Sequence, residues 1–310
     1  MKLFGLGTKT SARKMETAEL CMICLPAVIV VFIWCYLPMI GIIIPFKDFK
    51  YDLGVFGSEW CGLKNFEFFF KSDTAFVIVR NTLVLNALFI ITGTVVNIIF
   101  AILLYQITST KMVKLYQTVS MLPRFLTWII ASYMLYIFLD PQKGVLNEVL
   151  GFFGKDGIDW YTNPKYWPVI LVLSNIWKTV GNGMIIYYAA LMGIDNQMFE
   201  AADLDGATSF QKAWYISIPT IMPIIITMTI LSIGNIFRSD FSMFYQLTRN
   251  VPLLYSTTDV VDTYVYRALR QDGNISMSAA VGLIQSVVGF TLTIVTNYAV
   301  KKIDPDQAMF

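Results

Sequence analysis

Six long apolar runs dominate this 310-residue sequence. Each is at least as long as the roughly 20 residues that a helix needs to cross the hydrocarbon core of a bilayer. The runs cover residues 20–44, 81–107, 115–139, 166–193, 216–237 and 277–300. Lipid offers no partners for free backbone N–H and C=O groups, so segments of this kind are stable as helices. The sequence therefore predicts an all-α membrane protein with six transmembrane helices in a single domain over residues 1–310.

The composition excludes several classes of function. Hydrophobic residues make up 56% of the chain and charged residues 14%, whereas about a quarter of residues are charged in a soluble domain. The net charge of +2 comes without a basic cluster, so no nucleic-acid partner is expected. The chain has no histidine, which removes imidazole chemistry and the zinc sites that use it. No catalytic and no metal-ligating residues are predicted.

The flanks of the apolar runs predict the orientation of the chain. An even number of crossings places both termini on one side, and short cytoplasmic flanks are enriched in lysine and arginine. The basic flanks are Lys9, Arg13, Lys14, Lys111, Lys114, Lys301 and Lys302. We therefore expect a cytoplasmic N-terminal segment at 1–19 and a cytoplasmic tail at 301–310. Three longer segments, 46–80, 140–165 and 238–276, are then expected as short helices on the outer surface.

A polar stretch between the fourth and fifth runs, residues 195–215, interrupts the apolar pattern. Asp195 can cap a helix that contains Glu200, because a carboxylate accepts hydrogen bonds from free N–H groups at a helix start. Gly206 can adopt the open backbone that ends this helix, and Ser209 can cap a second helix that continues into the fifth run. The sequence predicts a cytoplasmic helical hairpin that transmits a push from a partner protein into the membrane helices.

The residues of this hairpin carry a resemblance. Glu200-Ala201-Ala202, Asp205-Gly206-Ala207 and the later Ile216 and Pro219 resemble the EAA loop of type I ABC importer permeases, at the same spacing. The likeness extends along the chain through "NIWK" (175–178), "GNIFRSDFSMFYQ" (234–246), "DTYVYRAL" (262–269) and "KKIDPDQAMF" (301–310). These stretches are similar to carbohydrate-uptake permeases, in particular those for oligosaccharides and uronate-bearing fragments.

The resemblance implies partners and a coupling contact. It implies a heterodimeric pore with a second homologous permease, two ATPase subunits, an extracellular sugar-binding lipoprotein and a bacterial plasma membrane. The residues that would contact the ATPase are Glu200, Ala201, Ala202, Asp205, Gly206, Ala207 and Thr208. Asp203 is an additional acid within the loop. The chain lacks a phosphate-binding loop, so it is expected to bind no cofactor itself, with ATP and Mg on a separate ATPase chain.

Polar residues within the apolar runs are candidates for a substrate path, since ionisable groups in a membrane are costly and usually functional. Lys178 lies near the middle of the fourth run, and Asn175 and Asn182 share its helix face. An internal ion pair or a carbonyl contact is the alternative role for Lys178. The other candidates are Asn235, Asp240, Tyr245 and Gln285, with Arg238 and Gln246 beside them. Arg238 and Asp240 are equally compatible with a simple ion pair.

These observations favour a permease subunit of an ATP-driven oligosaccharide importer that acts as a transport subunit rather than an enzyme. One alternative keeps the architecture and carries amino acids, peptides or another small solute. A second is an ATP-independent secondary transporter, for which the sequence has no inverted repeat or membrane acids. A membrane enzyme has no paired carboxylates or nucleophile and base pattern to support it.

Overall fold

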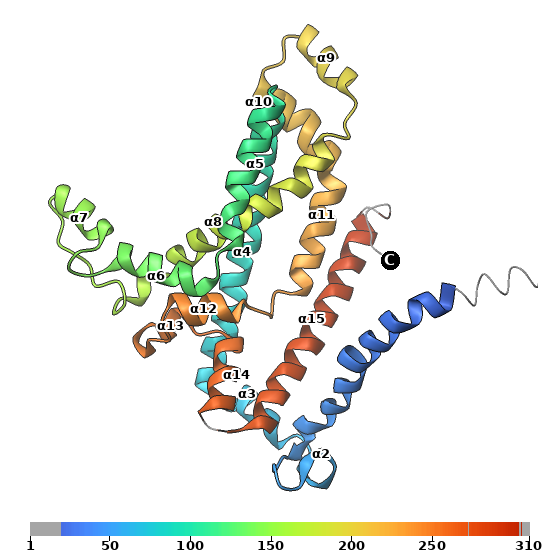
Figure 1. Cartoon of the computed structure of the whole chain (residues 1–310), viewed down its shortest axis with the longest axis vertical. Coiled ribbons are helices and arrows are strands. Elements are labelled where there is room, and N and C mark those ends of the chain that lie inside the picture. Colours follow the sequence, from blue (N-terminus) through green and yellow to red (C-terminus); the bar gives the residue numbers. More distant parts are fainter. Residues whose placement is uncertain (1–19, 272, 304, 306–310) are drawn as a thin grey trace, which may run out of the picture. The chain divides into compact units, whose positions relative to one another are not determined.

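The computed structural model describes residues 20–271, 273–303 and 305. The predicted segment 1–19 and most of the predicted tail 301–310 lie outside the described residues. The chain divides into two compact units, Met1–Asn65 and Phe66–Phe310, which Figure 1 traces in sequence colours.

The first unit contains an apolar helix and a small β-ribbon. The helix covers Leu20–Phe46 and includes η1 (Phe32–Tyr36) and η2 (Leu37–Phe46). Strands β1 (Lys47–Asp48) and β2 (Glu59–Trp60) pair antiparallel around α2 (Gly54–Gly57). None of the most apolar part of the helix is buried within the structure. Its surface therefore suits lipid or another membrane chain rather than water.

The second unit holds the remaining membrane helices and the segments that join them. Its elements are η3 (Lys64–Phe66) at the boundary, α3 (Glu67–Lys71), α4 (Asp73–Tyr105), α5 (Thr110–Phe125), α6 (Trp128–Leu139), α7 (Val145–Phe152), η4 (Pro164–Tyr166), α8 (Trp167–Leu191), α9 (Asn196–Leu204), α10 (Ser209–Lys212), η5 (Ala213–Ser217), α11 (Ile218–Gly234), α12 (Phe241–Leu247), η6 (Pro252–Leu254), α13 (Tyr255–Thr258), α14 (Val261–Arg270) and α15 (Ile275–Ile303). Five helices of the described chain are long and apolar enough to cross a membrane.

The third apolar run, 115–139, is predicted as one crossing that Pro123 kinks or splits, and the structure shows the split. It forms two helices, α5 and α6, which meet at an angle of 95° and give the sixth span if the pair is counted as one. Pro123 lies in the last turn of α5, and Leu126 and Thr127 adopt extended backbone between the helices. The Thr127 side chain then accepts a hydrogen bond from Ile130 N and caps α6. Proline and a capping threonine therefore break this span.

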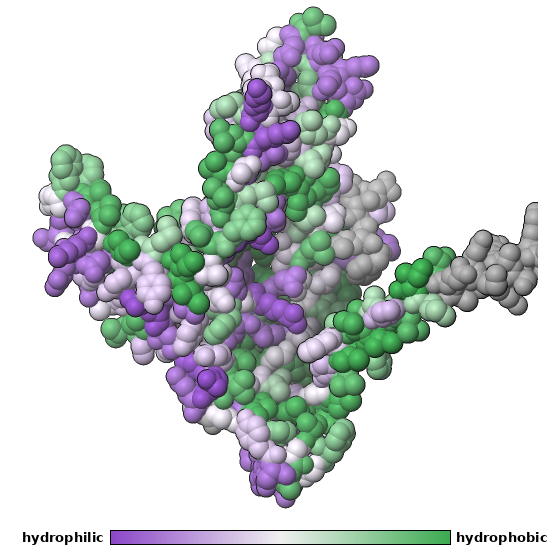
Figure 2. All heavy atoms as spheres, in the orientation of Figure 1, coloured by the Kyte–Doolittle hydropathy of each residue, from purple (hydrophilic) through white to green (hydrophobic). Residues whose placement is uncertain are grey.

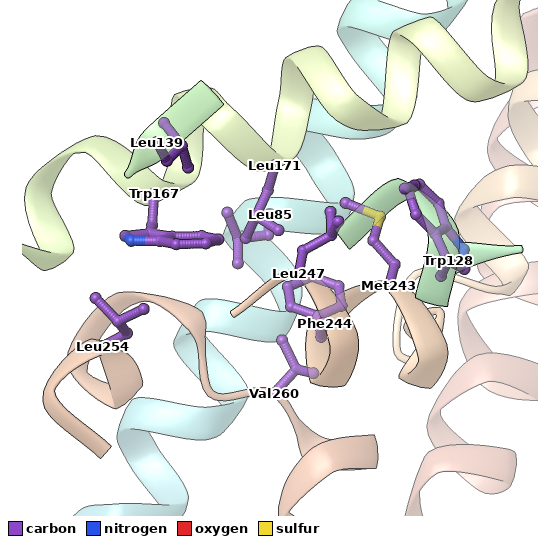
Figure 3. Close-up of a cluster of buried hydrophobic side chains, with 11 residues drawn as sticks. Leu85, Trp128, Leu139, Trp167, Leu171, Met243, Phe244, Leu247, Leu254 and Val260 are labelled. Atoms are coloured by element: carbon purple, nitrogen blue, oxygen red, sulfur yellow. The ribbon is translucent and has the colours of Figure 1, made fainter. Parts of the chain in front are cut away.

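A buried apolar cluster joins the segment 238–276 to the membrane helices (Figure 3). Its members are Leu85, Trp128, Ala131, Leu139, Trp167, Leu171, Met243, Phe244, Leu247, Leu254 and Val260. Phe244 and Leu247 of α12 are each 1% exposed. The segment was expected to lie on the surface, but α12 packs between α4, α6 and α8 because one face of this short helix is apolar.

Two glycines of α8 allow its neighbours to approach closely. A Cβ atom at Gly181 would lie 2.0 Å from the backbone oxygen of Ser120 in α5, and one at Gly183 would lie 2.2 Å from the Asn97 side chain in α4. Small residues at such crossings let helix backbones pack tightly in membranes. α8 is therefore the central helix against which α4 and α5 pack.

Candidate functional site

The hairpin between α8 and α11 begins with the predicted cap. The Asp195 side chain accepts a hydrogen bond from Gln197 N at 3.0 Å, and α9 begins at Asn196. Phe199 of α9 packs against Tyr105 at the end of α4, with ring centroids 5.5 Å apart. The cap and this aromatic contact fix the direction of the helix that carries Glu200.

α9 ends at a glycine turn. Gly206 has φ of 74°, a left-handed backbone that is strained for residues with a Cβ atom. Gly206 N donates to Asp203 O at 3.1 Å, and Ala207 N donates to Ala202 O at 2.9 Å. These two bonds form a Schellman motif and satisfy the last carbonyls of the helix. The turn chemistry of Asp205-Gly206-Ala207 thus sets the angle between the two arms of the hairpin.

The second arm is capped by Thr208, one residue before the predicted Ser209. Gln211 N donates to Thr208 Oγ1 at 3.3 Å, and Thr208 N donates to Gln211 Oε1 at 2.7 Å. This reciprocal pair is a capping box, and it needs a glutamine three residues after the cap. Ser209 has lysine at that offset, so it cannot form the same pair.

The additional acid of the loop is paired within the chain. Lys212 Nζ lies 2.6 Å from Asp203 Oδ1, across the two arms of the hairpin. The pair lines a cavity of about 400 Å³ together with Glu200, Ser209 and Ser217, among other residues. Glu200 itself has no ion-pair partner among the described residues, so its charge is available to another chain.

The hairpin also exposes large apolar side chains. Leu204 is 90% exposed, Phe210 76% and Met198 47%. Figure 2 shows hydrophilic residues gathered at this end of the unit with hydrophobic ones among them. An apolar group amid polar and charged neighbours in this position is typical of a protein contact surface.

A second candidate site is a polar cavity of about 460 Å³ between α4, α8 and α11. Four asparagines, three hydroxyl side chains and a tyrosine line it with apolar residues between them. The polar residues are Asn86, Asn97, Asn175, Asn235, Thr94, Thr179, Ser232 and Tyr187. Amides and hydroxyls both donate and accept hydrogen bonds, as sugar hydroxyls do, and the apolar wall suits sugar faces.

The end of α11 beside this cavity is held by side-chain bonds to its backbone. Asn86 Nδ2 donates to Ile236 O at 2.7 Å and to Ser239 Oγ at 3.0 Å, and Gln285 Nε2 donates to Phe237 O at 2.8 Å. Asp262 accepts from Ser239 N at 2.8 Å, while burial raises the pKa of its carboxyl. These bonds replace the helical partners that the chain loses after Gly234.

The sequence-predicted path residues lie in different places. Asn175 and Asn235 line the large cavity, and Gln285 lines a neighbouring one. Asn182 is exposed, and Tyr245 packs against Phe241 and Tyr266 with ring centroids 5.2 Å away in each case. These two residues do not line the large cavity.

Lys178 and Asp240 also lie outside its lining and contact the broken third span. Lys178 Nζ donates to Leu126 O, between α5 and α6, and lies 4.4 Å from the centre of the Trp128 ring. The Asp240 carboxylate accepts from Trp128 Nε1 and from Met243 N. The carbonyl contact that the sequence leaves open for Lys178 is thus present, and Arg238 and Asp240 form no ion pair.

Sequence reasoning missed the hydroxyl residues of the cavity. Thr179 Oγ1 and Ser232 Oγ donate to the carbonyls of Asn175 and Met228, four residues earlier. Serine and threonine satisfy themselves in this way anywhere in a helix, so they give no signal of a site. The one pattern that could have indicated Thr179 is its position four residues after Asn175, which places both side chains on the same face of α8.

The chain is similar to known transport proteins along nearly its whole length. The model of the family described as "Binding-protein-dependent transport system inner membrane component" matches residues 20–305. The polygalacturonan/rhamnogalacturonan transport system permease protein YteP of Bacillus subtilis (strain 168) is 36% identical over 278 residues, which cover 90% of this chain and 86% of the relative.

Two solved structures have the same fold. One is a bacterial ABC transporter involved in the import of the acidic polysaccharide alginate. It matches with a TM-score of 0.85 and 30% identity over 96% of this chain and 99% of that one. The other is a bacterial alginate ABC transporter in complex with an alginate pentasaccharide-bound periplasmic protein. It matches with a TM-score of 0.82 and 30% identity, covering 96% and 98% of the two chains.

Proposed function

Because the chain belongs to the family of binding-protein-dependent transport system inner membrane components, we propose that it is the permease subunit of an ATP-driven oligosaccharide importer. The observation that carries this proposal is the doubly capped hairpin between α8 and α11, which presents Glu200 and the exposed side chains of Leu204 and Phe210. The similarity to a polygalacturonan permease and to alginate importers supports an oligosaccharide cargo.

In this proposal the hairpin 195–215 binds to a separate ATPase subunit. Leu204 and Phe210 enter an apolar groove of that subunit, and Glu200 pairs with a basic group beside it. ATP and its magnesium ion bind to a pair of ATPase subunits, and a second permease completes the pore. Both termini and the hairpin then face the cytoplasm of a bacterium, and an extracellular binding protein delivers the sugar from the other side.

The two arms of the hairpin transmit movements of the bound ATPase subunit to the membrane helices. α10, η5 and α11 follow one another without a break from Ser209 to Gly234, so a displacement of the hairpin moves the α11 wall of the polar cavity. The contact between Phe199 and Tyr105 connects α9 to α4, which forms another wall. Asn175 and Asn235 would then meet the hydroxyls of the passing sugar.

The test is coupled transport by the assembled complex. The tagged full-length chain is produced together with the second permease and the ATPase, purified, and reconstituted in liposomes. ATP hydrolysis and uptake of oligogalacturonate are measured with and without the cognate binding protein. Both activities should require ATP and the binding protein. Uptake without ATP, or the absence of any ATPase in the purified complex, would contradict the proposal.

A charge substitution separates coupling from folding. Glu200→Ala should lower uptake per ATP hydrolysed and weaken retention of the ATPase about 10- to 100-fold, since a charge-assisted contact contributes about 1.5–3 kcal/mol. The matched control is Glu148→Ala, an exposed glutamate in α7 on the predicted outer side.

A labelling experiment tests the proposed orientation of the hairpin. A cysteine placed at Ala201, with the native cysteines replaced, should react only with a reagent that enters the cytoplasm.

A further inference from the structure

A smaller cavity adjoins the polar one along α11. It has a volume of about 280 Å³ and lies between the end of α11 and the middle of α15. Leu231 and Asn235 line both cavities, so the two share a rim. The smaller cavity differs in one respect, because its lining includes a cation, Arg238, whereas no charged residue lines the larger one.

Arg238 has unused hydrogen-bonding capacity. Arg238 is exposed, and its side chain donates a long hydrogen bond, 3.4 Å from Nη2 to Ser286 Oγ. A guanidinium carries five N–H donors. Among the described residues, no carboxylate lies within ion-pair distance of this arginine.

The two nearest acids are engaged elsewhere. Asp240 accepts from Trp128 Nε1 at 2.6 Å and caps α12 through Met243 N at 3.1 Å. Asp262 accepts from Ser239 N at 2.8 Å and from Gln285 Nε2 at 3.4 Å. Asp262 is close enough to influence Arg238 electrostatically, yet it forms no direct bridge to it. The cation therefore faces the cavity with its donors free for a ligand.

The hydrogen-bonding geometry and the single charge of Arg238 favour a carboxylate as the ligand. A guanidinium binds a carboxylate through two parallel hydrogen bonds, and an uncompensated cation among membrane helices is stabilised by an anion that passes it. One cation in the cavity matches one negative charge, whereas a phosphate ester with about two charges would call for further donors. Ser286 and Asn235 flank the arginine and can bond to neighbouring hydroxyls.

We propose that Arg238 is a specificity-determining residue that binds the carboxylate of a uronate unit while the neutral remainder of the sugar occupies the adjoining cavity. The proposal rests on the proposed import function and adds a charge requirement to it. In this proposal the cavity between α11 and α15 binds the charged group of the sugar, and the cavity between α4, α8 and α11 binds its hydroxyls.

The experiment compares two ligands of the same shape. Reconstituted wild-type and variant transporters receive a short oligogalacturonate or its methyl ester, which lacks the negative charge. Arg238→Gln should raise the KM for the acid about 10- to 100-fold and leave that for the ester within about twofold. Arg238→Lys should keep part of the preference, because lysine retains the charge without the planar pair of donors. The binding protein is common to all variants, so its own preference cancels in each comparison.

Controls separate this proposal from folding and from the import function. Arg270→Gln, an exposed arginine at the end of α14, should leave both KM values unchanged. Glycerol 3-phosphate is offered as a third substrate, to test a phosphate ester in place of a carboxylate. Equal losses for acid and ester in Arg238→Gln would overturn the proposal, as would no loss for the acid, or a larger loss for glycerol 3-phosphate than for the acid. Wild-type transporter that imports the ester but not the acid would overturn the charge requirement alone. Wild-type transporter that imports no oligosaccharide would instead overturn the import function.

Discussion

The indole nitrogen of Trp128 donates a hydrogen bond of 2.6 Å to the carboxylate of Asp240, across 112 residues of sequence. Trp128 is the first residue of α6, and Asp240 caps α12. Lys178 of α8 lies over the same indole ring. A small polar group thus joins the broken third span, the fourth span and the segment that follows α11.

Substitution of Asp240 should separate its two roles. Asp240→Ala removes a helix cap, which contributes about 1 kcal/mol, and leaves the Trp128 N–H without a partner, which costs about 1–3 kcal/mol. The two bonds go to different carboxylate oxygens, and asparagine keeps only one acceptor oxygen, so Asp240→Asn retains one of the two bonds and should lose less than the alanine variant. The measurement is the unfolding free energy of the full-length chain in detergent. Equal losses in the two variants would contradict this assignment.

The sequence could not predict that contact, although it predicted the helices. Of the predicted crossings, 277–300 lies within α15 and 81–107 lies in α4 up to its last residue, Tyr105, because long apolar runs have few alternatives to a helix in lipid. Pro123 predicts a kink or a split in the third run, and the structure has the split, but the proline alone does not set the angle of 95° between α5 and α6. The partners of Asp240 depend on that break.

The crossing of α5 and α8 should tolerate no side chain at Gly181. Gly181→Ala places a methyl group 2.0 Å from the Ser120 carbonyl oxygen, so the helices must separate and lose packing worth about 1–3 kcal/mol. The matched control is Gly282→Ala in α15, where no atom lies within 4 Å of the new methyl group. The midpoint temperature of thermal unfolding in detergent is measured for both variants. Similar midpoints would show that α5 and α8 pack less closely at Gly181 than the structure has it.

The hairpin turn should depend on the left-handed backbone of Gly206. Gly206→Ala strains this backbone by about 1–2 kcal/mol and should lower uptake per ATP hydrolysed. Gly206→Asn should retain more coupling than alanine does, because asparagine tolerates left-handed conformations better. Both ratios are measured in liposomes. Coupling that is lost equally in both variants would point to the side chain itself and against backbone strain.

The hairpin was the part of the candidate site most accessible from sequence. Asp195 and Gly206 act locally, so cap and turn chemistry can be read from neighbouring residues. The second cap is Thr208 and not the predicted Ser209, because only Thr208 has a glutamine, Gln211, three residues later as its reciprocal partner. The polar cavity was harder to predict, because Asn86, Asn175 and Asn235 come from three helices whose rotation is set by tertiary packing.

Lys178 should matter for stability and not for substrate preference. Lys178→Met removes a charged donor from the Leu126 carbonyl and the contact with the Trp128 ring, at a cost of about 1.5–3 kcal/mol. The control is Lys165→Met, an exposed lysine in η4. Unfolding and the KM ratio of acid to ester are both measured. A changed KM ratio in a variant of normal stability would instead place Lys178 on the substrate path.

Asp262 should make the stability of the fold depend on pH. Burial raises the pKa of this carboxyl above its usual value of 3.8, against the opposing effects of Ser239 N, Gln285 and Arg238. Between the two values the folded chain holds a proton that the unfolded chain has released, so stability falls as pH rises through this window and then stays level.

Asp262→Asn should remove that fall, because asparagine has no proton to release, while its amide oxygen can still accept from Ser239 N. Unfolding free energies of the full-length chain in detergent, taken between about pH 4 and pH 7, give the two slopes. Asp156→Asn, at an exposed position, should keep the wild-type slope. If Asp262→Asn keeps the fall as well, the fall arises in other carboxyl groups and the burial of Asp262 does not penalise its charge.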